Sequence, residues 1–462
     1  MTDRLERLSS LDVSNLRVED HGLPMHVAAL AILDGAALAD ASGQLHLDAV
    51  RAALQQRLHL APRLRQVLFR PRFGVGPPMW ADDAGFDIRQ HVRTRAVPAP
   101  GGEAELLDMC SELTEQPLSR ARPLWEMWLL TGLSDGSVGL FIRLHHVVAD
   151  GMAAIVMASA LFDPAPEAPA SDPPPWVPAP GPGEWELFAR NARWCAGALA
   201  SALSRLCRPL VVVRRFRVLA AQSRQLAREG LAPRVSLNRP AGPQRRLLLV
   251  RTDLDDARTV AHAHGGTVND VVLAAVAGGA RSLLEARGEL APELVLKASV
   301  AASTRGPAEQ PASGNRVGIL LVPLPVGDCD PVRRLAQIVR ATSVRKRLPP
   351  YQPSAGVLQR LMVRTMSRQR LVNLLVSNLH GPPGQLYFAG ASVLELFQVG
   401  VVQGNITISV GALSFAGHLN FDIVGDPAAV PDLAVFAAGL SDAVTRLGVR
   451  VIAPPQADEP AG

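Results

Sequence analysis

The side chains best suited to chemistry lie in the stretch RLHHVVADGMAA, residues 143–154. His145 and His146 are adjacent and end an apolar run, and Asp150 and Gly151 follow closely. An imidazole titrates near neutral pH, so a histidine held in such a setting suits general-base catalysis. A metal site on His146 and Asp150 would need a third ligand, and none has suitable spacing. The pattern predicts a base at His146 and no bound metal.

Each of these residues also has a structural interpretation. Asp is a common helix N-cap, and a lone histidine is often an ordinary core or surface residue. Gly151 lets another part of the backbone approach closely. Taken together, the four positions favour His146 as the base, with Asp150 fixing the local geometry through a further partner.

The residues before the histidines predict a strand over 137–146, and those after Asp150 predict a buried helix. Alternate side chains on a strand share a face, so His146 would stand at the end of an apolar face. The two faces are Val138, Leu140, Ile142, Leu144 and His146 on one side, and Gly139, Phe141, Arg143 and His145 on the other.

Strands and helices alternate irregularly elsewhere, which predicts an α/β or α+β fold. The proline-rich segment 164–183 reads as a linker between an N-terminal lobe, 1–163, and a C-terminal lobe, 184–462. Within 47–66 a helix is expected up to Pro62, and a second helix over 265–288. Strands are expected over 25–33, 123–130, 294–303, 316–326, 405–415 and 418–426.

Composition limits the functional classes. The net charge of +5 is too small for 462 residues to indicate nucleic-acid binding. The four cysteines form no C-x-x-C pair, and neither a secretory leader nor a long apolar stretch is visible. We therefore expect a cytoplasmic protein. The G-x-S-x-G pattern at 132–136 lies between two expected strands, so Ser134 is predicted to be a hairpin residue and not a nucleophile.

The H-H-x-x-x-D-G motif resembles the signature of the acyl-CoA-dependent acyltransferase superfamily, which includes chloramphenicol acetyltransferase and peptide-synthetase condensation domains. Further segments resemble, in the same order, the bacterial wax ester synthase/diacylglycerol acyltransferase family. They are LSSLDVSNLRVEDHGLPMHVAALAIL, PLWEMWLL, GGTVNDVVLAAVAGGARSLLEARG, SNLHGPPGQLYFAG and LSFAGHLNFDIVGDPAAVPDL.

The resemblance implies two chloramphenicol acetyltransferase-like lobes, each with a mixed sheet and flanking helices, and a tunnel between them. Acyl-CoA would be the co-substrate without a bound cofactor, and diacylglycerol or a long-chain alcohol the acceptor. His146 would take the acceptor's proton beside a helper position at His145, with Asp150 structural. Gly151, Asn269 and Asp270 would lie at the substrate.

Thr267 and Asp270 also resemble a helix-capping box, which leaves Asn269 near a helix N-terminus. Such a terminus stabilises developing negative charge, so Asn269 is expected to hold the thioester or the oxyanion. The structural alternative for Asn269 stays open.

Two alternatives to an acyl-CoA enzyme remain: a condensation-type enzyme that uses a carrier-protein thioester, and a non-catalytic lipid-binding homologue. The mixed apolar and Arg-rich segment 198–220 predicts either a helix pair broken at Pro209 or a segment lying on the inner membrane face or on lipid droplets.

Overall fold

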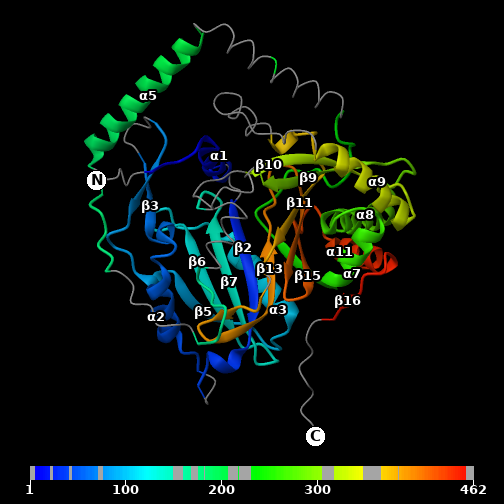
Figure 1. Ribbon diagram of the computed structural model, residues 1–462, viewed down its shortest axis with the longest axis horizontal. Coiled ribbons are helices and arrows are strands. Elements are labelled where there is room, and N and C mark those ends of the chain that lie inside the picture. Colours follow the sequence, from blue (N-terminus) through cyan, green and yellow to red (C-terminus); the bar gives the residue numbers. More distant parts are fainter. Residues whose placement is uncertain are drawn as a thin grey trace.

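Figure 1 shows the computed structural model, in which two large sheets lie side by side with helices on their outer faces. The first half of the chain supplies most of one sheet, and the second half supplies the other. The mixed α/β class is therefore confirmed. The structure describes residues 6–20, 24–40, 44–70, 76–148, 160–167, 175–181, 183–206, 217, 230–303, 317–346, 366–382 and 384–453.

The first sheet has six strands in the order β12-β13-β2-β7-β6-β5. All neighbours pair antiparallel except β5 and β6, which are parallel. The strands are β2 (His26–Leu33), β5 (Val92–Ala96), β6 (Trp125–Thr131), β7 (Val138–His145), β12 (Tyr387–Phe388) and β13 (Ala391–Val399).

Strand β7 is buried along its whole length, and its two faces are those expected from the alternation. One face packs in a core with helix α2 (Leu47–Arg57), whereas Phe141 packs on the other side with helix α3 (Glu103–Glu115). A Cβ at Gly139 would lie 3.0 Å from a methyl carbon of Leu106, so glycine lets α3 approach the strand closely.

Strand β13 joins the first sheet from the second half of the chain, where it pairs with β2 (Figure 1). Residues 387–399, which the predicted division places in the C-terminal lobe, therefore pair with a strand of the N-terminal lobe. Without them, β2 would present a row of unpaired backbone groups along the sheet edge. The predicted lobe boundaries themselves stay predictions.

The second sheet has seven strands in the order β10-β9-β11-β14-β15-β8-β16. Strand β11 runs parallel to both of its neighbours, and the other pairs are antiparallel. The strands are β8 (Arg246–Asp253), β9 (Leu296–Ser303), β10 (Val317–Leu324), β11 (Leu374–His380), β14 (Ile408–Phe415), β15 (His418–Gly425) and β16 (Val451–Ile452).

Helix α8 (Val268–Ala286) confirms the helix expected over 265–288 and lies at the centre of the largest apolar cluster. A Cβ at Gly278 would come within 2.2 Å of the Ala443 Cβ on α11 (Leu433–Arg446), so the two helices approach closely. Helices α7 (Leu254–Ala263) and α9 (Pro331–Arg345) also pack on α8. The helix expected up to Pro62 ends a few residues earlier: α2 stops at Arg57, and a 3₁₀ turn, η2 (Pro62–Arg65), begins at the proline.

A small sheet, with the order β1-β4-β3, and a long helix, α5 (Glu184–Leu206), lie at the edge of the molecule (Figure 1). Asn191 of α5 is fully buried, with its amide 3.2 Å from the Pro77 carbonyl oxygen, to which it donates. This hydrogen bond attaches the first turns of α5 to the rest of the molecule. The remaining elements are β1 (Glu6–Arg7), α1 (Ser10–Glu19), β3 (Gln66–Phe69), β4 (Met79–Asp82), η1 (Gly35–Ala37), η4 (Ile88–Gln90) and η5 (Met366–Arg368).

Buried polar side chains connect the two large sheets. Arg251 of β8 forms ion pairs with Glu103 of α3 and Glu395 of β13. Asp422 of β15 is fully buried, and one carboxyl oxygen accepts the Gly400 N–H at 3.1 Å. Burial raises the pKa of Asp422 to about 8, so this carboxyl is mostly protonated at neutral pH.

Candidate active site

The two histidines of the motif lie where β7 ends. His145 is the last residue of the strand, and His146 opens the turn that follows. The His146 backbone N–H donates to the Met25 carbonyl oxygen at 2.8 Å, and the Val148 N–H donates to the His145 carbonyl oxygen at 2.8 Å. The expected exit of His146 from the strand is confirmed. Asp150 and Gly151, with the helix expected after them, lie outside the described residues.

His145 is completely buried, and its surroundings fix its tautomer. The backbone N–H of Val147 donates to the ring nitrogen Nδ1 at 3.1 Å. A nitrogen that accepts a hydrogen bond carries no proton, so the ring proton of the neutral imidazole is on Nε2. That nitrogen lies 3.2 Å from a carboxylate oxygen of Glu19, Oε2.

Glu19 stands at the C-terminal end of α1 and faces three basic side chains. Its Oε1 lies 3.3 Å from Nε2 of His26, and its Oε2 contacts His145 and accepts from the Arg120 guanidinium. Burial alone would raise the pKa of Glu19, but the contacts with His145, His26 and Arg120 outweigh it and hold the pKa well below its usual range. The side chain is a carboxylate throughout the working pH range.

His26 begins β2 and is the direct cross-strand partner of His145. The two rings meet edge to face, with their centroids 6.0 Å apart. Burial lowers the pKa of His26 below its ordinary value, against the opposing influence of Glu19. His26 is therefore neutral at neutral pH, and its Nδ1 has no hydrogen-bond partner among the residues that the structure describes.

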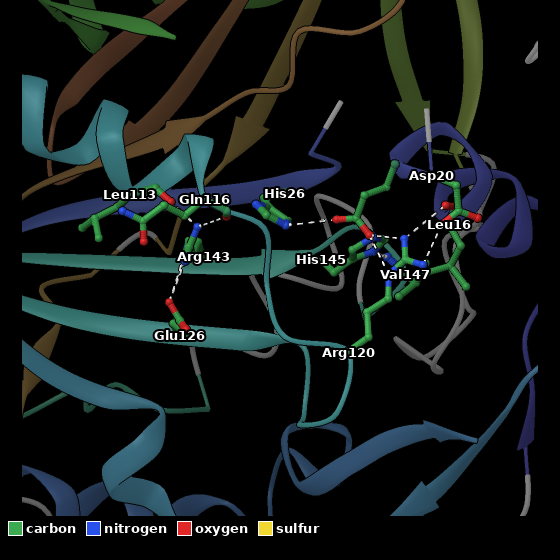
Figure 2. Close-up of polar contacts among 11 residues, drawn as sticks. Leu16, Asp20, His26, Leu113, Gln116, Arg120, Glu126, Arg143, His145 and Val147 are labelled. Carbon is green, nitrogen blue, oxygen red and sulfur yellow. Dashed lines mark hydrogen bonds and ion pairs between the residues drawn. The ribbon is translucent and has the colours of Figure 1, made fainter. Parts of the chain in front are cut away.

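Arg143 lies on the same face of β7 as His145 and is almost fully buried. Its guanidinium donates to Glu126 at 2.7 Å and to the carbonyl oxygens of Leu113 and Gln116 at the end of α3 (Figure 2). A cation at this end of a helix offsets its unpaired carbonyl groups. Arg143 thus joins β7 to β6 and α3 directly behind the motif.

The second predicted set of site residues opens α8, which packs on the other sheet. Asn269 is half-buried in the first turn. The carboxylate of Asp270 is buried and accepts from the Thr267 N–H and hydroxyl, at 2.7 Å each, and from the Thr342 hydroxyl at 2.6 Å. The expected cap is present at Asp270. Contact of Asn269 or Asp270 with substrate stays a prediction.

Ser134 lies in the hairpin between β6 and β7, with strands on both sides. This is the predicted hairpin and not the strand-to-helix turn that a serine nucleophile of this motif needs. Within the described ranges, no group of three or more potential ligands is arranged for a metal ion. The sequence analysis missed Glu19, His26 and Arg120, although the first two lie in a segment with a recognised resemblance. Glu19 and His26 flank a short loop. Their place beside His145 could be recognised only once the pairing of β2 with β7 is known.

Solved structures of other proteins share this fold. The wax ester synthase/diacylglycerol acyltransferase from Marinobacter aquaeolei VT8 superposes with a TM-score of 0.66 over 96% of this chain and 98% of that one, at 24% identity. A starter condensation domain of rhizomide synthetase, solved with C8-CoA and Leu-SNAC, gives 0.62 over 96% and 94%, at 15% identity. The fold is that of the chloramphenicol acetyltransferase-like acyltransferases, as expected.

The sequence narrows this class to one family. Residues 8–272 match the wax ester synthase/diacylglycerol acyltransferase catalytic domain, and residues 313–448 match the WS/DGAT C-terminal domain. Two Mycobacterium tuberculosis relatives, both named as diacylglycerol O-acyltransferases, are 32% and 30% identical. Each alignment covers 96% of this chain, and they cover 90% and 96% of those relatives. The chain belongs to the wax ester synthase/diacylglycerol acyltransferase family and is an acyltransferase.

Proposed function

We propose that this enzyme transfers a long acyl chain from acyl-CoA to the hydroxyl group of diacylglycerol or of a long-chain alcohol. The products are triacylglycerol or a wax ester, together with free CoA. The observation that carries the proposal is the position of His146 at the exit of the buried central strand β7, with its backbone fixed to Met25. The names of the relatives support the same substrates.

The reaction needs one base and no covalent acyl-enzyme. His146 takes the proton of the acceptor hydroxyl, and the oxygen attacks the carbonyl carbon of the thioester. The tetrahedral intermediate collapses with cleavage of the carbon–sulfur bond. The CoA thiolate then takes the proton from the imidazolium, which restores His146. Acyl-CoA is the co-substrate, and no bound cofactor takes part.

Other residues of the site have supporting roles in this proposal. Asn269, in the first turn of α8, holds the thioester or the developing oxyanion near the positive end of the helix. Asp270 caps that helix and so keeps Asn269 in place. Asp150 fixes the geometry of the motif, and Gly151 allows close approach of the backbone.

The test is CoA release from palmitoyl-CoA with dioleoylglycerol or hexadecanol as acceptor. We expect His146→Ala to lower the turnover of the enzyme roughly 10²–10⁴-fold, because general-base assistance is lost. Ser134→Ala, in the exposed hairpin, is the matched control and should leave the turnover unchanged. An active His146→Ala enzyme would contradict the base assignment. An inactive wild-type enzyme would favour a carrier-protein donor or a lipid-binding role.

We further propose that the enzyme is cytoplasmic and works at the inner membrane face or on lipid droplets, with α5 lying on the lipid surface. Trp185, Leu199 and Leu203 are 70%, 62% and 55% exposed, and their spacing places them on one stripe of the helix. A long helix with an exposed apolar stripe suits an interface between water and lipid. Within the described part of the chain, no single helix is long and apolar enough to cross a membrane.

A further inference from the structure

The carboxylate of Glu19 is shared by groups from three separate parts of the first sheet. His26 comes from the start of β2, His145 from the end of β7, and Arg120 from the loop before β6 (Figure 2). Glu19 itself is held at the end of α1, which begins with a cap at Ser9. One side chain therefore links the helix to both strand ends that surround the motif.

The type of side chain required here follows from its partners. The guanidinium of Arg120 only donates, and the His145 ring presents its Nε2 proton because Nδ1 is occupied by the Val147 N–H. Both groups face Oε2 of Glu19. A carboxylate accepts at both oxygens and donates at neither, so Glu19 accepts from Arg120 and places negative charge 3.2 Å from Nε2 of His145 and 3.3 Å from Nε2 of His26.

His145 in turn supports the turn that carries His146. The ring accepts the Val147 N–H, and the His145 carbonyl oxygen accepts the Val148 N–H. Both bonds run from His145 to residues that follow His146, so together they hold the turn across His146. Rotation of the His145 ring away from Glu19 would break the first of these bonds and release the turn.

We propose that Glu19 is a positioning residue, which locks His145 in the Nε2-protonated tautomer and thereby fixes the turn that presents His146 to the substrates. The proposal rests on the proposed role of His146 as base. Arg120 holds Glu19 in place, and its second partner, Asp20, does not contact the histidine pair. The cost of losing this support is kinetic, because misplacing a catalytic group by about 1 Å lowers the rate about 10²-fold.

The experiment compares Glu19→Ala, Glu19→Gln and the control Asp20→Asn in the palmitoyl-CoA assay. We expect Glu19→Ala to lower kcat about 10–100-fold with KM for palmitoyl-CoA within about twofold, because the Glu19 side chain is only 9% exposed and acts through His145. Glu19→Gln should recover part of kcat, since its amide oxygen can still face His145. Asp20→Asn should match the wild type. Thermal midpoints of all variants show that the enzymes compared are folded.

A second measurement reports the tautomer without turnover. Protein labelled with ¹⁵N at histidine gives ring-nitrogen shifts by NMR, and a His145→Asn sample assigns the signal. We expect the Nε2–H form in the wild type and in Asp20→Asn, and its loss in Glu19→Ala. An Nδ1–H form in the wild type would overturn the proposal, as would a folded Glu19→Ala enzyme with wild-type kcat.

The same assay separates the two proposals. If the wild type turns over, His146→Ala does not, and Glu19→Ala is unaffected, then only the positioning role fails. If His146→Ala keeps its activity or the wild type has none, the proposed function fails first and the positioning role fails with it.

Discussion

At the scale of single residues, the motif depends on groups that surround it. His145 is fully buried and directs its ring proton at Glu19, while Arg143 lies behind it in an ion pair with Glu126. These residues explain why a histidine that does no proposed chemistry precedes His146. A buried imidazole that accepts a backbone N–H and lies 3.2 Å from a carboxylate oxygen is a rigid anchor for a turn.

Asp422 gives the molecule a pH-dependent stability. Its pKa is raised to about 8 in the folded protein by burial, while the unfolded carboxyl titrates near 4. The stabilising contribution is fully present below about pH 4 and is lost as the pH rises through about 8. We expect the free energy of unfolding of the wild type to fall relative to Asp422→Asn over this range, by at most about 1.4 kcal/mol per pH unit.

The measurement is urea unfolding of both proteins at several pH values between 5 and 8.5. The amide of the variant can still accept the Gly400 N–H and does not titrate, so it is a suitable reference. Asp48→Asn, at an exposed position of α2, should keep a constant difference from the wild type. A difference between wild type and Asp422→Asn that does not change with pH would contradict this expectation.

At the scale of elements, the spacing of apolar residues was sufficient to predict a strand or helix whose apolar side chains follow one regular period throughout. The buried run of β7 and the apolar helix α8 were predicted within a few residues. Strand β13 was missed because its face pattern is interrupted by a bulge between Val393 and Glu395. Pro62 was rightly predicted as a helix boundary, although α2 already ends at Arg57 and η2 begins at the proline.

The site residues also fall into two groups: those that the local sequence predicted and those that pairing between distant strands brings together. His145 and His146 are neighbours in sequence, so the motif alone predicted their place at the strand end. Glu19 and Arg120 are brought to His145 by the pairing of β2, β7 and β6, and pairing between distant segments is not encoded in any local period. Asn269 lies on an element of the other sheet, so its distance from the motif could not be judged from spacing.

The contact between α8 and α11 gives a prediction at this scale. A methyl group at Gly278 would clash with the Ala443 Cβ, so we expect Gly278→Ala to lower the free energy of unfolding by about 1–3 kcal/mol. Gly197→Ala in α5 is the matched control, because nothing lies within 4 Å of its added methyl group. Helix propensity should make that variant more stable by about 0.5–1 kcal/mol. Urea unfolding measures both, and a Gly278→Ala protein as stable as the control would refute the close approach.

At the scale of the whole molecule, the two halves of the chain are joined by strand β13, which the second half contributes to the first sheet, and by the buried ion pairs of Arg251. Helix α5 is attached at its first turns and lies at the edge of the molecule (Figure 1). Its apolar stripe of Trp185, Leu199 and Leu203 is exposed. The proposed arrangement places that stripe in lipid, where an insoluble acceptor and product are dissolved.

Flotation with vesicles of phosphatidylcholine, phosphatidylglycerol and dioleoylglycerol tests the proposal. We expect the triple variant Trp185→Ser, Leu199→Ser and Leu203→Ser to bind vesicles about tenfold less, because each lost side chain removes apolar area from the interface. Ser204→Asn, on the polar side of α5, should bind as the wild type does. Equal binding of the triple variant would exclude α5 as the lipid contact.

The late position of β13 in the chain also bears on how the protein is made. Strand β2 and strand β7 leave the ribosome long before residues 391–399 are synthesised, and at about 5–20 residues per second the interval is roughly 12–50 s. During that time the nascent first sheet has an open edge at β2. The first sheet therefore gains its full set of strands only late in translation.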